Sequence, residues 1–357
     1  MDFVDKALAR RLESAEEVPQ VRYAEIFQKL QPQIGAAAEP VCGGHMIFAG
    51  VGSPIGRVTG AGFREPVAAA DLDRVEEFYR SKAAPSQVDV CPLTDSSLLE
   101  LLKQRNYTLF ELNNVLYRRL DPAESFPSTD AAVICPGGKE ETGEFADIVG
   151  RSFFPDGNSP FDMAQTMSPL FQMDGALAFV AKVDGKMAAC AAGLVIQEHG
   201  IVALFGAGTL SEYRRRGLQT ALLQTRMAAA AKAGCEFAVI VTQGGTTSQR
   251  NAERLGFRVA YSKATMLKST PSFTQGRLTV MRVCRPIHWD RYGGLSERPA
   301  MAEVFNGILP FTIGIIVRRA ENLGRALCRD RGGCSRHSRV PSPKVQLPLA
   351  ARLRLIQ

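Results

Sequence analysis

The chain has 357 residues, of which 45% are hydrophobic and 22% charged, a composition typical of a soluble globular protein and unlike that of a fibrous or wholly disordered chain. The formal net charge of +7 is unevenly distributed, because residues 271–357 hold 15 Lys and Arg against 5 Asp and Glu, whereas residues 1–270 hold 28 against 31. The basic excess therefore belongs to the end of the chain, and we expect no nucleic-acid partner for the folded part.

Other classes of protein are excluded by short patterns. The eight cysteines are scattered without a CxxC pair, so we expect reduced thiols and no metal site. The acidic N-terminus has no secretory apolar segment, and the longest apolar run, 304–317, is shorter than the roughly 20 residues that span a bilayer. We therefore expect a cytoplasmic protein with no membrane partner, and we leave its oligomeric state open.

Residues 1–120 contain a weak copy of a later part of the chain. A helix over Leu72–Ser81 is followed by a strand–helix–strand pattern at 88–91, 97–105 and 109–117, which parallels the pattern at 239–242, 248–255 and 259–267. We interpret this as two copies of one fold, the first without its middle. Residues 121–130, with Pro122 and Pro127, are the predicted linker.

Residues 131–270 alternate between strand and helix periodicity. A strand at 131–135 and a helix at 139–154 precede three strands at 176–183, 188–197 and 201–210, which turn signals join into an antiparallel meander. A helix then starts at Leu218, and strand 236–242, helix 246–255 and strand 257–267 complete the unit. The fold class is therefore α+β with a mixed sheet.

Residues 271–357 lack continuous periodicity and are rich in Gly, Pro, Ser and Arg. We predict a mostly disordered basic tail that is dispensable for the chemistry.

The most informative segment runs from Ala207 to Leu223. A strand enters a short basic turn and a helix begins at once, which directs unpaired backbone N–H groups and the positive end of the helix dipole at one point. Such a point suits a pyrophosphate. Gly217 allows close approach of the phosphates, Thr220 can donate a hydroxyl, and Arg215 and Arg216 add positive charge. The alternative is a solvated basic turn before an ordinary amphipathic helix.

The context of this loop resembles the GNAT superfamily of N-acetyltransferases, whose acetyl-CoA loop has the form Arg/Gln-x-x-Gly-x-Gly/Ala. Here the match is Arg214-x-x-Gly217-x-Gln219, with Gln in the last position. The resemblance covers about residues 130–268 and implies a GNAT acyl-CoA N-acyltransferase fold, in two copies. It also implies that acetyl-CoA contacts the main chain of Ala207, Gly208 and Thr209, the loop residues through Leu218 and Gln219, and Asn251 in the following helix.

The resemblance implies transfer of acetyl from acetyl-CoA to an unidentified primary amine, either a small molecule or a peptide, by direct attack on the thioester. The general-acid Tyr of many relatives is missing, because Asn251 and Glu253 occupy its place. Tyr261 is a weak substitute, since a Tyr on a strand is more often a packing residue. A non-catalytic acyl-CoA-binding module is therefore the alternative. Residues 1–120 have acidic residues before their helix, and we interpret them as a degenerate copy without a phosphate loop.

Overall fold

The computed structural model describes residues 3–126, 130–154 and 162–269, and these residues belong to one compact unit. The tail predicted at 271–357 lies outside them. The described first half contains α1 (Lys6–Leu30), β1 (Ala37–Val41), β2 (Gly44–Phe48), β3 (Val58–Thr59), α2 (Ala69–Ser81), β4 (Ser86–Val90), α3 (Ser96–Gln104) and β5 (Thr108–Arg119). The described second half contains β6 (Val133–Pro136), α4 (Thr142–Phe153), α5 (Met163–Met167), β7 (Ala176–Val183), β8 (Lys186–Ile196), β9 (Ile201–Thr209), α6 (Leu218–Lys232), β10 (Phe237–Gln243), α7 (Thr247–Arg254) and β11 (Arg258–Lys268).

The internal repeat predicted from the sequence is present and is more complete than we expected. The order β1-β2-β3-α2-β4-α3-β5 recurs as β7-β8-β9-α6-β10-α7-β11. In both copies the third and fourth strands pair in parallel. The prediction that the first copy lacks its middle was therefore wrong. Its three middle strands have only 5, 5 and 2 residues, and strands this short leave little periodic signal in a sequence.

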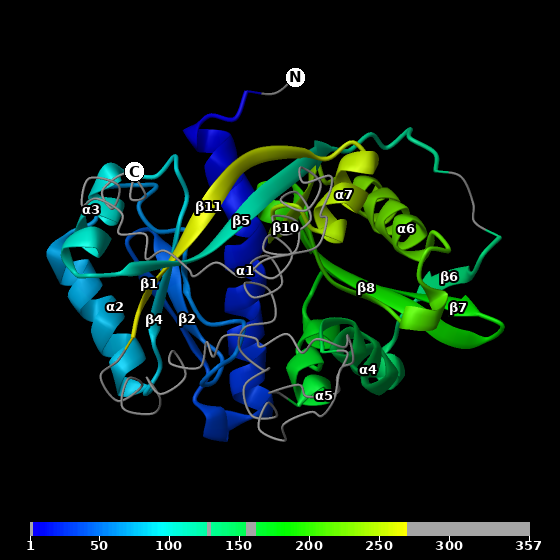
Figure 1. The fold of residues 1–357 in the computed structure, drawn as a ribbon, viewed down its shortest axis with the longest axis horizontal. Helices are drawn as coiled ribbons and strands as arrows, with labels where there is room; N and C mark the ends of the chain where they lie inside the picture. Colours follow the sequence, from blue (N-terminus) through cyan, green and yellow to red (C-terminus); the bar gives the residue numbers. More distant parts are fainter. Residues whose placement is uncertain (1–2, 127–129, 155–161, 270–357) are drawn as a thin grey trace, which may run out of the picture. The chain divides into compact units, whose positions relative to one another are not determined.

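The two copies exchange their last strands within one sheet. In the described ranges eleven strands follow the order β1-β2-β3-β4-β11-β5-β10-β9-β8-β7-β6. The last strand of the second half, β11, thus lies between β4 and β5, and β5 of the first half lies beside β10 of the second (Figure 1). The domain division at 121–130 stays a prediction, although strands that precede this segment are hydrogen-bonded to strands that follow it.

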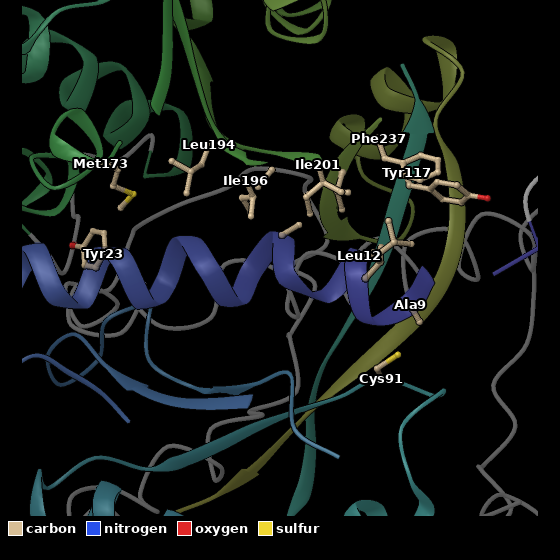
Figure 2. Close-up of a cluster of buried hydrophobic side chains, with 14 of the residues drawn as sticks. Ala9, Leu12, Tyr23, Cys91, Tyr117, Met173, Leu194, Ile196, Ile201 and Phe237 are labelled. Atoms are coloured by element: carbon tan, nitrogen blue, oxygen red, sulfur yellow. The ribbon is translucent and has the colours of Figure 1, made fainter. Parts of the chain in front are cut away.

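Helix α1 packs against strands of both halves. Asp5 caps its N-terminus by accepting a hydrogen bond from Leu8 N at 2.8 Å. Figure 2 shows side chains of both halves pointing toward this helix: Leu194 and Ile196 from β8, Ile201 from β9, Phe237 from β10, Tyr117 from β5 and Cys91 after β4. The buried face of α1 also contains Glu13, Ser14 and Glu17, which interrupt its apolar periodicity, and we therefore did not predict this helix.

A buried ionic cluster fixes α1 to the exchanged strand. Lys263 of β11, whose side chain is 1% exposed, lies 3.2 Å from Glu13 Oε2 and 3.4 Å from Asp89 Oδ2, and it also pairs with Glu16. Burial acts to lower the pKa of Lys263, but the surrounding carboxylates hold it well above its usual value. The pKa of Glu13 is raised by burial. The cluster therefore joins α1, β4 and β11 in the interior.

Two sets of helices cover the second half of the sheet. Helices α4 and α5 lie on the same face as α1, since Cys190 and Ala192 of β8 contact α4 while Leu194 and Ile196 of the same strand contact α1. Helices α6 and α7 lie on the opposite face (Figure 1). Side chains of both helices belong to one apolar cluster.

Candidate functional site

Strands β9 and β10 diverge in the middle of the sheet. They pair in parallel at three positions, Ile201 with Phe237, Val202 with Ala238 and Ala203 with Val239, and the pairing ends there. The β8–β9 register shifts between Cys190 and Ala192, and Gly206 opposite this shift has a φ of +56°, as in a β-bulge. The bend leaves the main chain of β9 from residue 204 to 209 without a ladder on its β10 side.

The predicted contact residues Ala207, Gly208 and Thr209 lie on this diverging end of β9. Gly208 is buried, and a Cβ at this position would lie 2.8 Å from Ser152 Oγ and 3.0 Å from Ile148 O. Helix α4 therefore approaches the strand there. The packing of this helix requires a small residue at 208, and the contact of the main chain there with acetyl-CoA stays a prediction.

The loop after β9 leads directly into an uncapped helix. Arg215 and Gly217 have left-handed backbones, with φ of +65° and +79°, and α6 begins at Leu218 with no side-chain cap. The first backbone bond of the helix is donated by Ala221 N to Gly217 O, so the N–H groups of residues 218–220 point out of the helix. A Cβ at Gly217 would meet no atom within 4 Å. The helix dipole thus faces open space.

Gln219 joins the start of α6 to the end of β9. Its side-chain Nε2 donates to Gly208 O at 2.7 Å and to Thr209 Oγ1 at 2.9 Å. The side chain is therefore turned back toward the protein, and it leaves the backbone N–H of Gln219 on the side of the loop. This geometry explains how Gln fits where the motif commonly has a small residue.

Three consecutive arginines, at 214–216, lie in the loop that precedes the N-terminus of α6. Arg214 Nε donates to Thr209 O at 3.3 Å, and the Arg216 guanidinium stacks over the Tyr213 ring with 5.2 Å between them. Arg215 and Arg216 are exposed, as is Thr220. Together with the helix dipole, these cations suit a multiply charged anion such as a pyrophosphate.

The remaining predicted residues lie in two different places. Asn251 is half-buried on α7, which covers the same sheet face as α6. Tyr261 is instead buried under α1, where its hydroxyl donates to Glu13 Oε1 at 2.9 Å. Burial raises the pKa of Tyr261 far above its usual value. The structure therefore gives Tyr261 a packing position, and it does not bring it to the α6 loop.

Sequence reasoning missed Arg226, which stabilises the bulge of β9 from the other face. This arginine of α6 is 3% exposed, and its NH1 donates to Ala192 O at 2.5 Å while its Nε donates to Leu222 O at 3.1 Å. A longer contact of 3.5 Å joins NH1 to Phe205 O. Burial lowers the pKa of Arg226 to about 10. Its position four residues after Leu222, on the apolar face of the helix, was the available signal.

Three further observations concern the described residues. No group of three or more potential ligand side chains within the described ranges could hold a metal ion. A cavity of about 590 Å³ is lined in part by Tyr23, Phe27, Phe48 and Lys82, and none of the predicted cofactor-binding residues lines it. Among the helices that the structure describes, none is both long and apolar enough to cross a membrane.

Known proteins are similar to this chain in the region of the site. A sequence model described as the acetyltransferase (GNAT) family matches residues 144–257. No curated protein matches the chain in sequence.

One solved structure shares the fold over a longer part of the chain, and two others are reported beside it. A GCN5-related N-acetyltransferase from Kribbella flavida is 16% identical with a TM-score of 0.50, and the match covers 71% of this chain and 98% of that one. One from Sphaerobacter thermophilus is 17% identical over 59% and 70% of the two chains, with a TM-score of 0.44. A tandem GNAT protein from the clavulanic acid biosynthesis pathway is 14% identical over 65% and 78%, with a TM-score of 0.47. The diverging strands, the basic loop and the uncapped helix all lie within residues 144–257, the part of this chain that matches the acetyltransferase (GNAT) family.

Proposed function

We propose that this protein transfers the acetyl group of acetyl-CoA to a primary amine. The observation that carries the proposal is the uncapped start of α6, which opens to free space at Gly217 and lies beside the gap between β9 and β10. The pyrophosphate would bind the N–H groups of residues 217–220 with Arg215 and Arg216, and the pantetheine arm would follow the main chain of residues 207–209. Asn251 would contact the same substrate from α7.

The reaction is direct attack of the neutral amine nitrogen on the thioester carbonyl. A C–N bond forms and the C–S bond breaks, and the proton that the attacking nitrogen loses goes to the leaving CoA thiolate, so that the products are the amide and the CoA thiol. The β-bulge supports this chemistry, because Arg226 holds two of the carbonyl groups around it and so fixes the strand beside which the thioester would lie.

We assign one acetyl-CoA site to each chain. The corresponding helix of the first half, α2, is capped by its own acid, since Asp71 Oδ2 accepts a hydrogen bond from Ala68 N at 3.0 Å. A carboxylate at this point repels a pyrophosphate. Calorimetric titration should therefore saturate at one acetyl-CoA per chain, and saturation at two would contradict the assignment of the first half as a degenerate copy.

A non-catalytic acyl-CoA-binding module is the second candidate, and the burial of Tyr261 favours it. Thiol release with a panel of primary amines separates the two. Acetyl-CoA binding with amine-dependent thiol release supports the transferase. Binding without release for any amine supports the module, and the absence of acetyl-CoA binding contradicts both.

A further inference from the structure

An open surface adjoins the gap between β9 and β10 on the face that α1 covers. Close to α1, the strand residues are fully buried: Ala203, Val239 and Val115 are 2%, 1% and 0% exposed. Two residues further toward the gap on the same face, Phe205, Val241 and Asn113 are half-buried. Helix α1 thus covers one end of these strands and leaves the other end open beside the proposed thioester position.

The exchanged strand β5 places a carboxylate of the first half on this surface. Asn113 of β5 pairs with Gln243 at the end of β10, and Glu111 follows on the same face. The Glu111 carboxylate accepts a hydrogen bond from Gln243 Nε2 at 3.0 Å, and the Glu111 side chain is 25% exposed. An acidic group is therefore oriented by the strand that borders the gap, and it remains accessible to solvent.

The negative charge of Glu111 is only partly neutralised. Its nearest cation is Arg57, whose NH1 lies 3.5 Å from Glu111 Oε2. The same NH1 lies 3.5 Å from Asp89 Oδ1 and donates to Thr265 Oγ1 at 3.2 Å. One guanidinium is thus shared between two carboxylates, of which Asp89 is fully buried and Glu111 is not. The accessible member of the set can accept a further cation.

We propose that Glu111 binds a cationic group of the amine acceptor, and that the acceptor is a diamine or another alkyl amine with a second ammonium group. The inference rests on the proposed acetyltransferase function. The attacking nitrogen must lose its proton, so an ion pair at that nitrogen fades as the reaction proceeds. A carboxylate that holds a second ammonium group keeps its interaction throughout. Phe205 and Val241 provide apolar contact for the methylene chain between the two nitrogens.

The test compares two amines that differ by one charge, 1,4-diaminobutane and n-butylamine, at saturating acetyl-CoA. Glu111→Gln keeps the size of the side chain and removes its charge, and Glu111→Asp restores the charge on a shorter side chain. Glu39→Gln, at an exposed position on β1, is the matched control for a lost surface charge. KM and kcat come from thiol release, and acetyl-CoA affinity comes from calorimetry.

We expect Glu111→Gln to raise KM for 1,4-diaminobutane about tenfold and to change KM for n-butylamine less than threefold. Acetyl-CoA affinity should stay unchanged, Glu39→Gln should match the wild type, and Glu111→Asp should recover part of the loss. Equal effects on both amines, or a wild-type protein that acetylates n-butylamine as well as the diamine or acetylates neither, would overturn the inference. In each of these cases acetyl-CoA still binds and at least one amine of the wider panel supports thiol release, whereas failure of the proposed function appears as thiol release with no amine at all or as loss of acetyl-CoA binding by the wild type.

Discussion

Replacing Gly217 by Val tests the proposed phosphate loop against a control at the other end of the same helix. Gly217 precedes α6 with φ +79°, Gly234 follows it with φ +85°, and a Cβ at either position would meet no atom within 4 Å. The two substitutions therefore carry the same cost, a side chain forced into a left-handed backbone, which is roughly 1–2 kcal/mol. For a folded region of this size, that cost corresponds to a fall in Tm of roughly 2–8 °C.

The two variants should differ in cofactor binding. A Val side chain at 217 occupies the space in front of the helix N-terminus, and the loss of two hydrogen bonds to a charged phosphate costs about 3 kcal/mol, or about 100-fold in Kd. A Val at 234 lies at the other end of α6 and should leave the acetyl-CoA Kd unchanged. Calorimetry measures both Kd values, and differential scanning fluorimetry checks that the Tm losses match. Equal acetyl-CoA affinity in the two variants would refute the assignment of the loop.

Three further predictions concern the fold. Lys263→Met should lower the free energy of unfolding by about 3–5 kcal/mol, because it leaves buried carboxylates without their cation. Lys268→Met on the same strand removes a half-exposed ion pair and should lower it by less than about 1 kcal/mol. Urea denaturation measures both values. Burial acts to raise the pKa of Glu17, but hydrogen bonds with His45 and Arg10 hold this pKa below its ordinary value, so the stability that Glu17 contributes is present above the ordinary carboxyl pKa and disappears as pH falls through the lowered value. Glu17→Gln should therefore lower the free energy of unfolding at neutral pH, and its urea midpoint should fall less than that of the wild type when the solution is acidified. An equal fall in both proteins would contradict this. Chains of residues 1–126 and 130–269, produced separately, each lack the strand that the other half supplies, so neither should fold alone. After mixing, size-exclusion chromatography should show one 1:1 complex. A folded monomer of either piece would contradict this prediction.

The second half of the fold was predictable because its strands and helices are long and regular. The predicted strand at 176–183 coincides with β7, and the predicted helix start at Leu218 coincides with that of α6. The position of the loop before α6 could be predicted for the same reason, since a strand, an Arg-rich turn with Gly217 and a helix follow one another in the sequence. Local patterns of this kind need no knowledge of distant contacts.

The elements that escaped prediction depend on contacts between distant residues. The buried face of helix α1 could not be recognised from its sequence because it contains Glu13 and Glu17. Their ion-pair partners, Lys263 and His45, belong to other elements of the fold. The exchange of β5 and β11 leaves no local signal, because each strand has the same pattern whichever neighbour it pairs with. The contacts of Arg226 with the β9 bulge and of Glu111 with Gln243 could not be predicted for a related reason, since they depend on a bulge and on a strand order that the folded sheet defines.

The position of β11 has a consequence for how the protein is made. The sheet of the first half has a gap between β4 and β5 that is closed only by residues 258–268. During synthesis, more than a hundred residues are added after β5 before β11 is available to pair with β4 and β5. Until then the edges of β4 and β5 are exposed. Folding of the first half during synthesis is thus coupled to completion of the second half, and a chain that stops early is left with unpaired strand edges that favour aggregation.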